Sequence, residues 1–475
     1  MAKEPEHTFD KAHDSLNAAE ITEDIGNPAE TLSGLARDEY YMKRALELAR
    51  KGAGWVNPNP MVGAVIVKDG KIIGEGWHTR YGELHAERQA LANCTENTEG
   101  ATIYVTLEPC CHTGKTPPCT EALIEAKFAR VVCGAPDPNP LVAGKGFEIL
   151  RQAGIEVTEN VLLDECLAIN EVFFHYIRTK TPYVILKYAM TLDGKIATRS
   201  GKSKWITSEA ARKRVHEDRH RYSAIMVGVN TVIKDDPLLT CRLMDFQTDD
   251  CACSQVGAEN EVQANNAEKK TMPFSVADKE IAAQSKLSEK VLEQAIDEEL
   301  EQELLDEELD DALAQKNQSN QNNRVKNPIR IICDTHLRTP LNSQIVQTAI
   351  SVPTYIATTV SDINKHMPYR EMDVDIIVCP LADGHVDMAV LFEKLGALGI
   401  DSVIVEGGAE INWSVLAYEL VNKVQTYIAP KIFGGSDAPS PVAGLGVEAP
   451  KYAFEFKNMK ITQLGPDVLL ECEAR

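Results

Sequence analysis

The sequence predicts two α/β domains in series, the second of which contains a long acidic insertion. Three observations lead to this prediction. A chain of 475 residues is long enough for two or three domains of roughly 150 residues each. Strand-like and helical segments alternate between residues 38 and 180, and a second alternating pattern runs from residue 181 to the end. The second alternation is interrupted at residues 243–327 by a segment rich in acidic residues.

The first domain is expected to follow a polar extension. Residues 1–37 are polar and weakly periodic, which is typical of a disordered segment. The first helix is predicted over residues 39–51, because apolar residues recur there at helical spacing. Two apolar runs, 61–67 and 71–77, then flank Asp69-Gly70, a dipeptide that favours a tight hairpin turn.

The rest of the first domain alternates between strands and helices, as a layered α/β sheet requires. A helix is also expected to start near residue 85. We expect the domain core to end near residue 160, and one helix over residues 164–178 to lead out of it. The alternating elements are predicted at 102–107 (strand), 120–128 (helix), 130–133 (strand) and 146–153 (helix).

The second domain, residues 181–475, repeats this pattern over about 200 residues plus the insertion. Short apolar runs typical of buried strands recur along it, with helical segments between many of them. These runs lie at 183–189, 224–227, 329–333, 354–357, 375–379, 402–405 and 424–428.

The insertion at residues 243–327 differs in composition from both domains. It holds 20 Asp and Glu against 8 Lys and Arg, so it carries −12 of the net charge of −22. Such a segment cannot bury a core, and we interpret it as a spacer, within which residues 286–316 could form a solvated acidic helix. The alternative is a docking segment for a basic partner.

Composition also excludes several classes of function. A net charge of −22 disfavours a broad surface that neutralises nucleic-acid phosphates. The apolar runs near the motifs are far shorter than a membrane span, and the polar N-terminus does not resemble a signal peptide. The 12 cysteines are therefore expected to be reduced, in a cytoplasmic protein, and clustered ones to be metal ligands or catalytic groups.

One cluster has the composition of a catalytic zinc site. His85-Ala86-Glu87 stands at the predicted start of a helix, and Cys110 and Cys119 follow downstream. One imidazole and two thiolates supply three ligands to Zn²⁺ and leave the fourth position for water, whose pKa the metal lowers. Glu87 can move protons to a ring nitrogen and to leaving ammonia without binding the metal.

The spacing of the two cysteines leaves rival ligands. Zinc deaminases usually combine HxE with PCxxC, but eight residues separate Cys110 from Cys119 here, so Cys111 and His112 are candidates as well. We favour Cys119, because Thr-Pro-Pro-Cys would enter a new helix, and a helix start stabilises a thiolate. A closed zinc site without catalysis is the alternative, but it gives Glu87 no role.

The motifs NPNPMVGAVIV, HAE and TLEPCCHTGKTPPC closely resemble the bifunctional deaminase–reductase family of riboflavin biosynthesis (RibD type). The resemblance covers about residues 39–475 apart from the insertion. It implies a cytidine-deaminase-like three-layer αβα domain that hydrolytically deaminates 2,5-diamino-6-(5-phosphoribosylamino)pyrimidin-4-one. It also implies a dihydrofolate-reductase-like α/β domain that then reduces the ribosyl group to ribityl with NADPH, in a homo-oligomer built through this reductase half.

Glycine turns in the second domain suggest a nucleotide or phosphate pocket independently of the resemblance. They follow apolar strands at Gly228, Gly407-Gly408 and Gly434-Gly435, where backbone can approach a ligand. No GxGxxG is present, so a Rossmann domain is not supported. Ordinary tight turns are nearly as good an interpretation of the glycines alone.

The resemblance assigns ligands to this pocket by position. It implies that NADP contacts Ala189, Trp205, Thr231, Asp235, Thr335, Gly408, Ala409, Glu410, Ile411, Asn412, Trp413 and Ser414. It implies that the phosphoribosyl substrate contacts Ser203, Arg219, Leu238, Arg242 and Glu406. Two arginines suit one phosphate, although Arg219 could be an exposed helix charge and Trp205 a core residue. Asp235 and Glu406 are both candidates for orienting the substrate or handling its protons.

Two other functions are consistent with parts of the sequence. A nucleoside or tRNA-editing deaminase with an appended domain would share the zinc motif, but the acidic charge and long cysteine spacing disfavour it. A non-enzymatic regulator that keeps the fold would use the acidic segment for binding, but the intact set of His85, Glu87, Cys110 and Cys119 argues against it.

Overall fold

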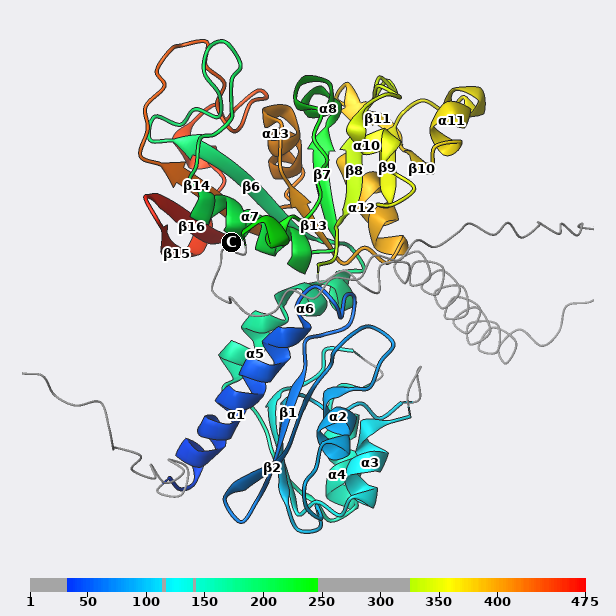
Figure 1. Cartoon of the computed structure of the whole chain (residues 1–475), viewed down its shortest axis with the longest axis vertical. Coiled ribbons are helices and arrows are strands. Elements are labelled where there is room, and N and C mark those ends of the chain that lie inside the picture. Colours follow the sequence, from blue (N-terminus) through cyan, green and yellow to red (C-terminus); the bar gives the residue numbers. More distant parts are fainter. Residues whose placement is uncertain (1–31, 113–116, 140–141, 247–324) are drawn as a thin grey trace, which may run out of the picture.

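The structure, a computed structural model, describes residues 32–112, 117–139, 142–246 and 325–475. These residues form two lobes that meet near helix α6 (Glu171–Thr179) (Figure 1). Most of the predicted extension and nearly all of the predicted insertion, including its acidic helix at 286–316, lie outside the described residues. The first helix, α1, begins at Leu35, three residues before the predicted start of the first domain.

The N-terminal lobe is a three-layer αβα sandwich around a five-stranded sheet of order β2-β1-β3-β4-β5. Helices α1 and α5 lie on one face, and α2, α3 and α4 cover the other (Figure 1). The strands are β1 (Gly63–Lys68), β2 (Lys71–Trp77), β3 (Thr102–Leu107), β4 (Arg130–Ala135) and β5 (Glu156–Thr158). The helices are α1 (Leu35–Ala49), α2 (Ala86–Ala92), α3 (Cys119–Glu125), α4 (Lys145–Gln152) and α5 (Leu163–Ile169), with a short η2 (Arg50–Gly52).

The predicted hairpin is confirmed by the pairing of β1 with β2. The two strands run antiparallel, with Lys68 opposite Lys71. Asp69 and Gly70 have φ angles of 50° and 77°, so both central residues of the turn adopt the left-handed conformation that Asp-Gly tolerates well. The turn type therefore matches the right-handed twist of the strands.

The prediction of a single helix over residues 164–178 is wrong. The chain forms two helices there, α5 and α6, with a break at Asn170, whose φ and ψ angles are −113° and 23°. The buried Asn170 side chain accepts a hydrogen bond from the Met61 N–H at 2.8 Å and donates one to the Met61 carbonyl at 2.9 Å. Apolar periodicity continues through the break, so the sequence pattern did not reveal it.

The C-terminal lobe is built on a nine-stranded sheet of order β10-β9-β8-β7-β13-β6-β14-β16-β15. Seven strands, from β10 to β14 in this order, are parallel, and all seven predicted strands are among them. They are β6 (Tyr183–Thr191), β7 (Ala224–Gly228), β8 (Ile329–Cys333), β9 (Thr354–Thr358), β10 (Val374–Val378), β13 (Ser402–Val405) and β14 (Lys423–Ala429).

Helices cover both faces of this sheet, so the central strands are buried on both sides. In β7, Ala224 and Met226 pack toward α12 (Met388–Ala397) and α13 (Ala409–Ala417), whereas Ile225 and Val227 pack toward α8 and α10 on the opposite face. The remaining helical elements are α7 (Glu209–Arg221), α8 (Val229–Asp235), η3 (Leu243–Phe246), α10 (Gln344–Gln347), α11 (Ile363–Arg370) and η4 (Pro450–Tyr452). A small hairpin, β11 (Leu381–Ala382) and β12 (His385–Val386), follows β10.

The C-terminal strand pair was not predicted. Strands β15 (Phe456–Leu464) and β16 (Asp467–Ala474) form an antiparallel hairpin that adds to β14 at the edge of the sheet. Six of the nine β15 residues are exposed, so the strand lacks the apolar run by which the seven parallel strands were predicted. Among the described residues, no helix is long and apolar enough to cross a membrane.

Candidate active sites

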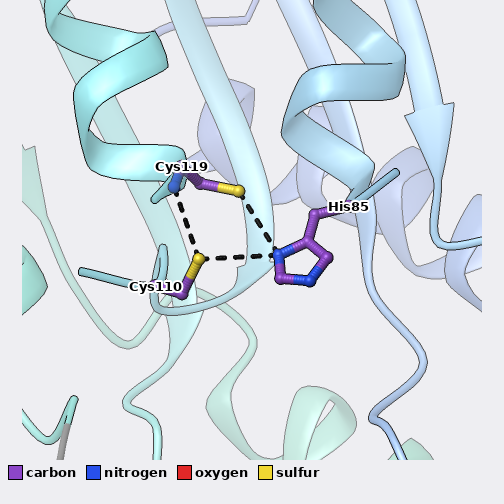
Figure 2. A group of neighbouring side chains, drawn as sticks. All are labelled: His85, Cys110 and Cys119. Carbon is purple, nitrogen blue, oxygen red and sulfur yellow. Dashed lines mark hydrogen bonds between the residues drawn. The ribbon is translucent and has the colours of Figure 1, made fainter. Parts of the chain in front are cut away.

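The first site lies where two helices of the N-terminal lobe begin. His85 directly precedes α2, and Cys119 is the first residue of α3, after Pro117 and Pro118. Cys110 lies in the loop that follows β3. The chain thus brings together three residues from three segments, and Figure 2 shows both sulfur atoms pointing toward the same imidazole nitrogen.

The three side chains have the geometry of a metal site. The Nδ1 atom of His85 lies 3.5 Å from Sγ of Cys110 and 3.4 Å from Sγ of Cys119 (Figure 2). All three ligand atoms lie within 4.8 Å of one another. Soft sulfur and imidazole donors at this spacing suit Zn²⁺ and leave one tetrahedral position open.

The two cysteines share their charge unequally. Cys110 also accepts a hydrogen bond from the backbone N–H of Cys119 at 3.3 Å. The Cys119 side chain, and then His85, stabilise the Cys110 thiolate by hydrogen bonding and lower its pKa to about 4. The hydrogen bond with Cys110 raises the pKa of Cys119, which keeps the shared proton, and raises the pKa of His85. One thiolate is therefore already available to a cation.

Glu87 lies beside this group on the first turn of α2 and is only 3% exposed. Burial, and then the negative charge of Cys110, raise the pKa of the Glu87 carboxyl to about 6. A carboxyl with a pKa near neutrality can both accept and release a proton. The site therefore combines three metal-ligand atoms with one proton-exchanging group.

The rival ligands stand apart from this cluster. Among the described residues, the group of possible metal ligands at this place contains His85, Cys110 and Cys119 but neither Cys111 nor His112. His112 is exposed, and burial raises the pKa of the Cys111 thiol, which disfavours its thiolate form. The geometry agrees with the choice of Cys119 made from the expected helix start.

Sequence reasoning missed two polar residues next to the cluster. The buried His78 ring packs edge-on against the His85 ring, with 5.5 Å between the ring centroids. Asn59 donates a hydrogen bond to His78 at 3.3 Å. A signal was present, because Asn59 belongs to the NPNP motif and His78 directly follows the apolar run at 71–77.

The second site is a pocket of about 830 Å³ in the C-terminal lobe. It opens at the carboxyl ends of the parallel strands β6, β7, β8 and β13, where ligands of open α/β sheets usually bind. Twelve of the residues predicted for the cofactor and substrate line it: Ala189, Ser203, Thr231, Asp235, Thr335, Glu406, Gly408, Ala409, Glu410, Ile411, Asn412 and Ser414.

Five predicted residues do not line the pocket. Trp205 is 62% exposed beneath the Arg212 guanidinium, so the alternative of a core tryptophan is wrong. Trp413 lies on α13, and its ring packs against the ring of Phe454. The other three, Arg219, Leu238 and Arg242, lie outside the lining as well.

The start of α13 suits a phosphate-containing ligand. The helix begins at Ala409, directly after Gly407 and Gly408, so its first backbone N–H groups have no partner within the helix and lie at the pocket. A Cβ atom added to Gly408 would find only Thr231 Oγ1, at 3.9 Å, so the space over this turn is open. Asn412 Oδ1 is buried in the lining without a hydrogen-bond partner among the described residues. These features fit a dinucleotide.

A buried charge cluster of Arg219, Glu406 and Lys187 borders the pocket, and Glu406 and Lys187 line it. Arg219 donates two hydrogen bonds to Glu406, from Nε to Oε1 and from Nη2 to Oε2, each of 2.8 Å. Lys187 Nζ lies 3.7 Å from Glu406 Oε2. Burial alone would raise the pKa of Glu406, but the charges of Arg219 and Lys187 lower it to about 2. Glu406 is therefore ionised at neutral pH.

Within this cluster, Arg219 is a largely buried and fully hydrogen-bonded residue rather than a surface charge. Its side chain is 12% exposed, so the alternative of a solvated helix charge is wrong. Its third donor group, Nη1, bonds to the Thr240 carbonyl at 3.1 Å, so all three guanidinium nitrogens already have partners. Arg242 is 42% exposed and lies 3.8 Å from Asp245.

Cationic residues of the pocket also escaped sequence reasoning. Lys187, Lys234 and Arg338 line it. Burial lowers the pKa of Lys187, although Glu406 opposes this shift. Lys187 could have been found, because it stands two residues before Ala189 on β6, and alternate residues of a strand share a face.

Comparisons with known proteins match each lobe to a known enzyme domain. The family model described as "Cytidine and deoxycytidylate deaminase zinc-binding region" matches residues 35–135, and the "RibD C-terminal domain" model matches residues 182–470. Several curated proteins named "Riboflavin biosynthesis protein RibD" match over 91% of the chain. The protein from Actinobacillus pleuropneumoniae is 43% identical, with 94% of its length covered, and that from Escherichia coli is 38% identical, with 98% covered.

Solved structures agree with the sequence relatives. Acinetobacter baumannii RibD superposes with a TM-score of 0.69 at 30% identity, covering 93% of this chain and 100% of that one. The Thermotoga maritima protein described as a diaminohydroxyphosphoribosylaminopyrimidine deaminase / 5-amino-6-(5-phosphoribosylamino)uracil reductase gives a TM-score of 0.67 at 34% identity. It covers 93% of this chain and 99% of that one.

Proposed function

Because the chain belongs to the RibD family of riboflavin-biosynthesis proteins, we propose that each lobe carries one of its two reactions. The chain is a bifunctional enzyme, a zinc-dependent deaminase and an NADPH-dependent reductase. It hydrolytically deaminates 2,5-diamino-6-(5-phosphoribosylamino)pyrimidin-4-one and then reduces the ribosyl group of the product to ribityl. We assign deamination to residues 38–180 and reduction to residues 181–475, an assignment that the matched ranges support.

We propose that His85, Cys110 and Cys119 hold the zinc ion. The observation that carries this assignment is the convergence of His85 Nδ1 and two cysteine sulfurs within 4.8 Å, beside the buried Glu87. When bound, zinc supplies an activated water for attack on the ring carbon that carries the amino group. The low pKa of Cys110 favours the deprotonated ligand that a metal requires.

Glu87 is the proposed proton carrier of the deaminase. Its carboxylate accepts a proton from the attacking water and delivers it to the ring nitrogen, and then carries the second proton of that water to the leaving ammonia. Burial supports this role, because it raises the pKa of Glu87 to about 6 and keeps bulk water from competing for the proton.

For the reductase, we propose that the turn before α13 and the residues that line the pocket hold NADPH, which supplies the hydride when bound. Asn412 Oδ1 and the first N–H groups of α13 offer acceptor and donor groups to it. Thr231 and Asp235, on α8, and Thr335, in the loop after β8, border the same space, so the cofactor is held beside these two segments. Trp205 and Trp413 do not line the pocket, but we keep them as proposed contacts of the cofactor.

The proposed substrate side of the pocket is the part lined by Glu406 and Ser203. Arg219, which holds Glu406, remains a proposed substrate contact, as do Leu238 and Arg242. Glu406 cannot donate a proton at neutral pH, since Arg219 and Lys187 hold its pKa at about 2. Its carboxylate is suited to orient ribose hydroxyls. Lys187, which borders the pocket, can donate a hydrogen bond or a proton to the opened sugar.

Metal analysis tests the deaminase assignment. We expect about one zinc per chain in the wild type and its loss in Cys110→Ser, with reductase activity retained. A matched Cys111→Ser variant should keep the metal, because Cys111 stands outside the ligand group. If zinc were retained in Cys110→Ser but lost in Cys111→Ser, the zinc ligand would be Cys111 and not Cys110.

We also propose a homo-oligomer that joins through the reductase lobe. The support is β15, the terminal strand of the nine-stranded sheet, where Met459 and Ile461 are 65% and 66% exposed. An open strand edge that carries large exposed apolar side chains offers a surface on which a second copy can pair. A wild type that sediments as a dimer, and Ile461→Lys as a monomer, would agree with this proposal, whereas a monomeric wild type would refute it.

The remaining partner and location proposals follow from charge and cysteine chemistry. A net charge of −22 supports small-molecule substrates rather than nucleic acid. None of the cysteines in the described ranges forms a disulfide, which supports a reducing, cytoplasmic location. Cytidine and tRNA should not be deaminated under conditions in which the diaminopyrimidine is.

A further inference from the structure

We propose that Asp401, a residue of the reductase lobe, is a positioning residue for the deaminase site. It acts through a turn of the N-terminal lobe, residues 56–59, that contacts His78, whose ring packs against the proposed zinc ligand His85. The inference rests on the proposed zinc site and goes beyond it, because it makes deamination depend on a side chain of the other lobe.

Asp401 is a rigid anchor. It directly precedes β13 and is only 1% exposed. Its Oδ1 accepts hydrogen bonds from the hydroxyls of Ser223 and Ser402, each of 2.6 Å, and its Oδ2 accepts one of 2.7 Å from Nδ2 of Asn57. A buried carboxylate with three donors is held in one orientation, and only the Asn57 donor comes from the other lobe.

The turn that carries Asn57 packs closely against the reductase lobe. The Asn59 N–H donates to the Val56 carbonyl at 2.8 Å, so Asn57 and Asn59 belong to one turn. At Gly54, an added Cβ would lie 2.4 Å from the His220 carbonyl of α7. Movement of Asn57 therefore moves Asn59 with it.

Asn59 in turn fixes the position of the His78 ring by a hydrogen bond. Its Nδ2 lies 3.3 Å from Nε2 of His78, and His78 Nδ1 lies 3.2 Å from the Leu84 carbonyl. Because a carbonyl only accepts hydrogen bonds, Nδ1 carries the proton and Nε2 accepts from Asn59. Both nitrogens of the neutral ring are thus fixed.

The fixed His78 ring touches the ligand set. It packs edge-on against His85 at 5.5 Å, and its partner Leu84 is the residue before His85. Residues that orient a metal ligand from behind typically change activity 10–100-fold when mutated. We expect the more remote Asn57–Asp401 bond to contribute about tenfold, through the orientation of His85.

The test compares two variants that each remove one hydrogen bond between the lobes. Asn57→Ala removes the bond to Asp401, and Tyr176→Phe removes the bond from Tyr176 Oη to the Gly396 carbonyl, of 2.9 Å, which lies on α6 away from the turn. Deamination, reduction of the deaminated substrate and zinc content are measured for the full chain. We expect kcat/KM for deamination to fall about tenfold in Asn57→Ala only, with zinc and reductase activity kept.

A double-mutant cycle shows whether Asp401 acts through Asn57. Asp401→Ala should lower deamination as much as Asn57→Ala, and the double variant should be no slower than either. Asp401→Asn keeps an oxygen for the Asn57 amide and should retain most of the activity, which a role of the negative charge alone would not allow.

Three results would overturn the proposal: equal loss in Tyr176→Phe and Asn57→Ala, unchanged deamination in Asn57→Ala, or additive losses in the double variant. Absence of deamination in the zinc-loaded wild type would instead refute the proposed zinc site. Retained reductase activity shows in each case that the chain has folded.

Discussion

At the scale of single residues, hydrogen bonding and burial set the protonation of the side chains at the deaminase site. Without a metal, hydrogen bonds from Cys119 and His85 lower the pKa of Cys110, whereas burial, and then the charge of Cys110, raise the pKa of Glu87 to about 6. The residue types were readable from the sequence. Their division of labour was not, since it depends on sulfur atoms from residues 110 and 119 meeting one nitrogen.

The first prediction concerns Glu87. Glu87→Gln keeps the shape of the side chain but cannot accept a proton, so deamination should fall by about 10³-fold or more. Zinc content should stay near one per chain, as measured by metal analysis, and reductase activity should not change. Wild-type rates of deamination in the variant would exclude the role of proton carrier.

The second prediction concerns the buried ion pair of the reductase. Arg219→Met leaves Glu406 buried with only Lys187, at 3.7 Å, and should lower the free energy of unfolding by about 3 kcal/mol in urea titrations. Arg242→Met is the matched control. Its side chain is 42% exposed and 3.8 Å from Asp245, so it should cost less than about 1 kcal/mol. Equal losses in the two variants would contradict the burial argument.

At the scale of elements, α7 joins the reductase site to the two ends of the acidic segment. Arg219 reaches Glu406 from this helix, and His216 accepts a hydrogen bond on Nδ1 from the Arg242 N–H at 3.1 Å. Burial, and then the charges of Arg219 and Arg242, lower the pKa of His216 to about 4. The helix therefore carries a histidine that folding keeps neutral.

The third prediction follows from this histidine. The unfolded chain binds a proton on His216 below pH 6.5, whereas the folded chain binds it only near pH 4. Stability is therefore lost as the pH falls from 6.5 to 4, because the unfolded state takes up more protons in that window. His216→Asn keeps an acceptor in place of Nδ1 and should lose less stability over this range in urea titrations. Parallel pH profiles would contradict the assignment.

Elements were predictable where burial leaves a pattern. The seven parallel strands of the second sheet carry apolar runs because helices cover both faces, and each was predicted from its sequence. The edge strand β15 was missed because most of its residues face solvent. The break at Asn170 was missed because two hydrogen bonds to Met61, more than a hundred residues away, stabilise it. Such contacts depend on tertiary structure rather than on local pattern.

At the scale of the whole molecule, the acidic segment, residues 243–327, interrupts the sequence of the reductase lobe. The described residues at its two ends both contact α7. The Phe246 ring lies 5.5 Å from the His216 ring, and the Lys326 N–H donates to His220 Nδ1 at 3.0 Å. Positions 216 and 220 are about one helical turn apart, so the two flanks are close in space.

The fourth prediction is that residues 247–324 can be deleted. A short Gly-Ser bridge can span the gap, and closing a shorter loop costs no more entropy than closing the long one. Reductase kcat/KM should stay within tenfold of the wild type, and deamination should not change. A folded deletion variant without reductase activity would mean that the segment contributes to the pocket, not only to spacing.

The central claim is that one chain performs two successive reactions at two separate sites. The most direct measurement supplies the zinc-loaded wild type with the diaminopyrimidine ribosyl phosphate, with and without NADPH, and identifies the products by mass. We predict ammonia and a deaminated ribosyl product without NADPH, and a deaminated ribityl product with it. A ribityl product that keeps both amino groups, or no ammonia in either reaction, would contradict the account.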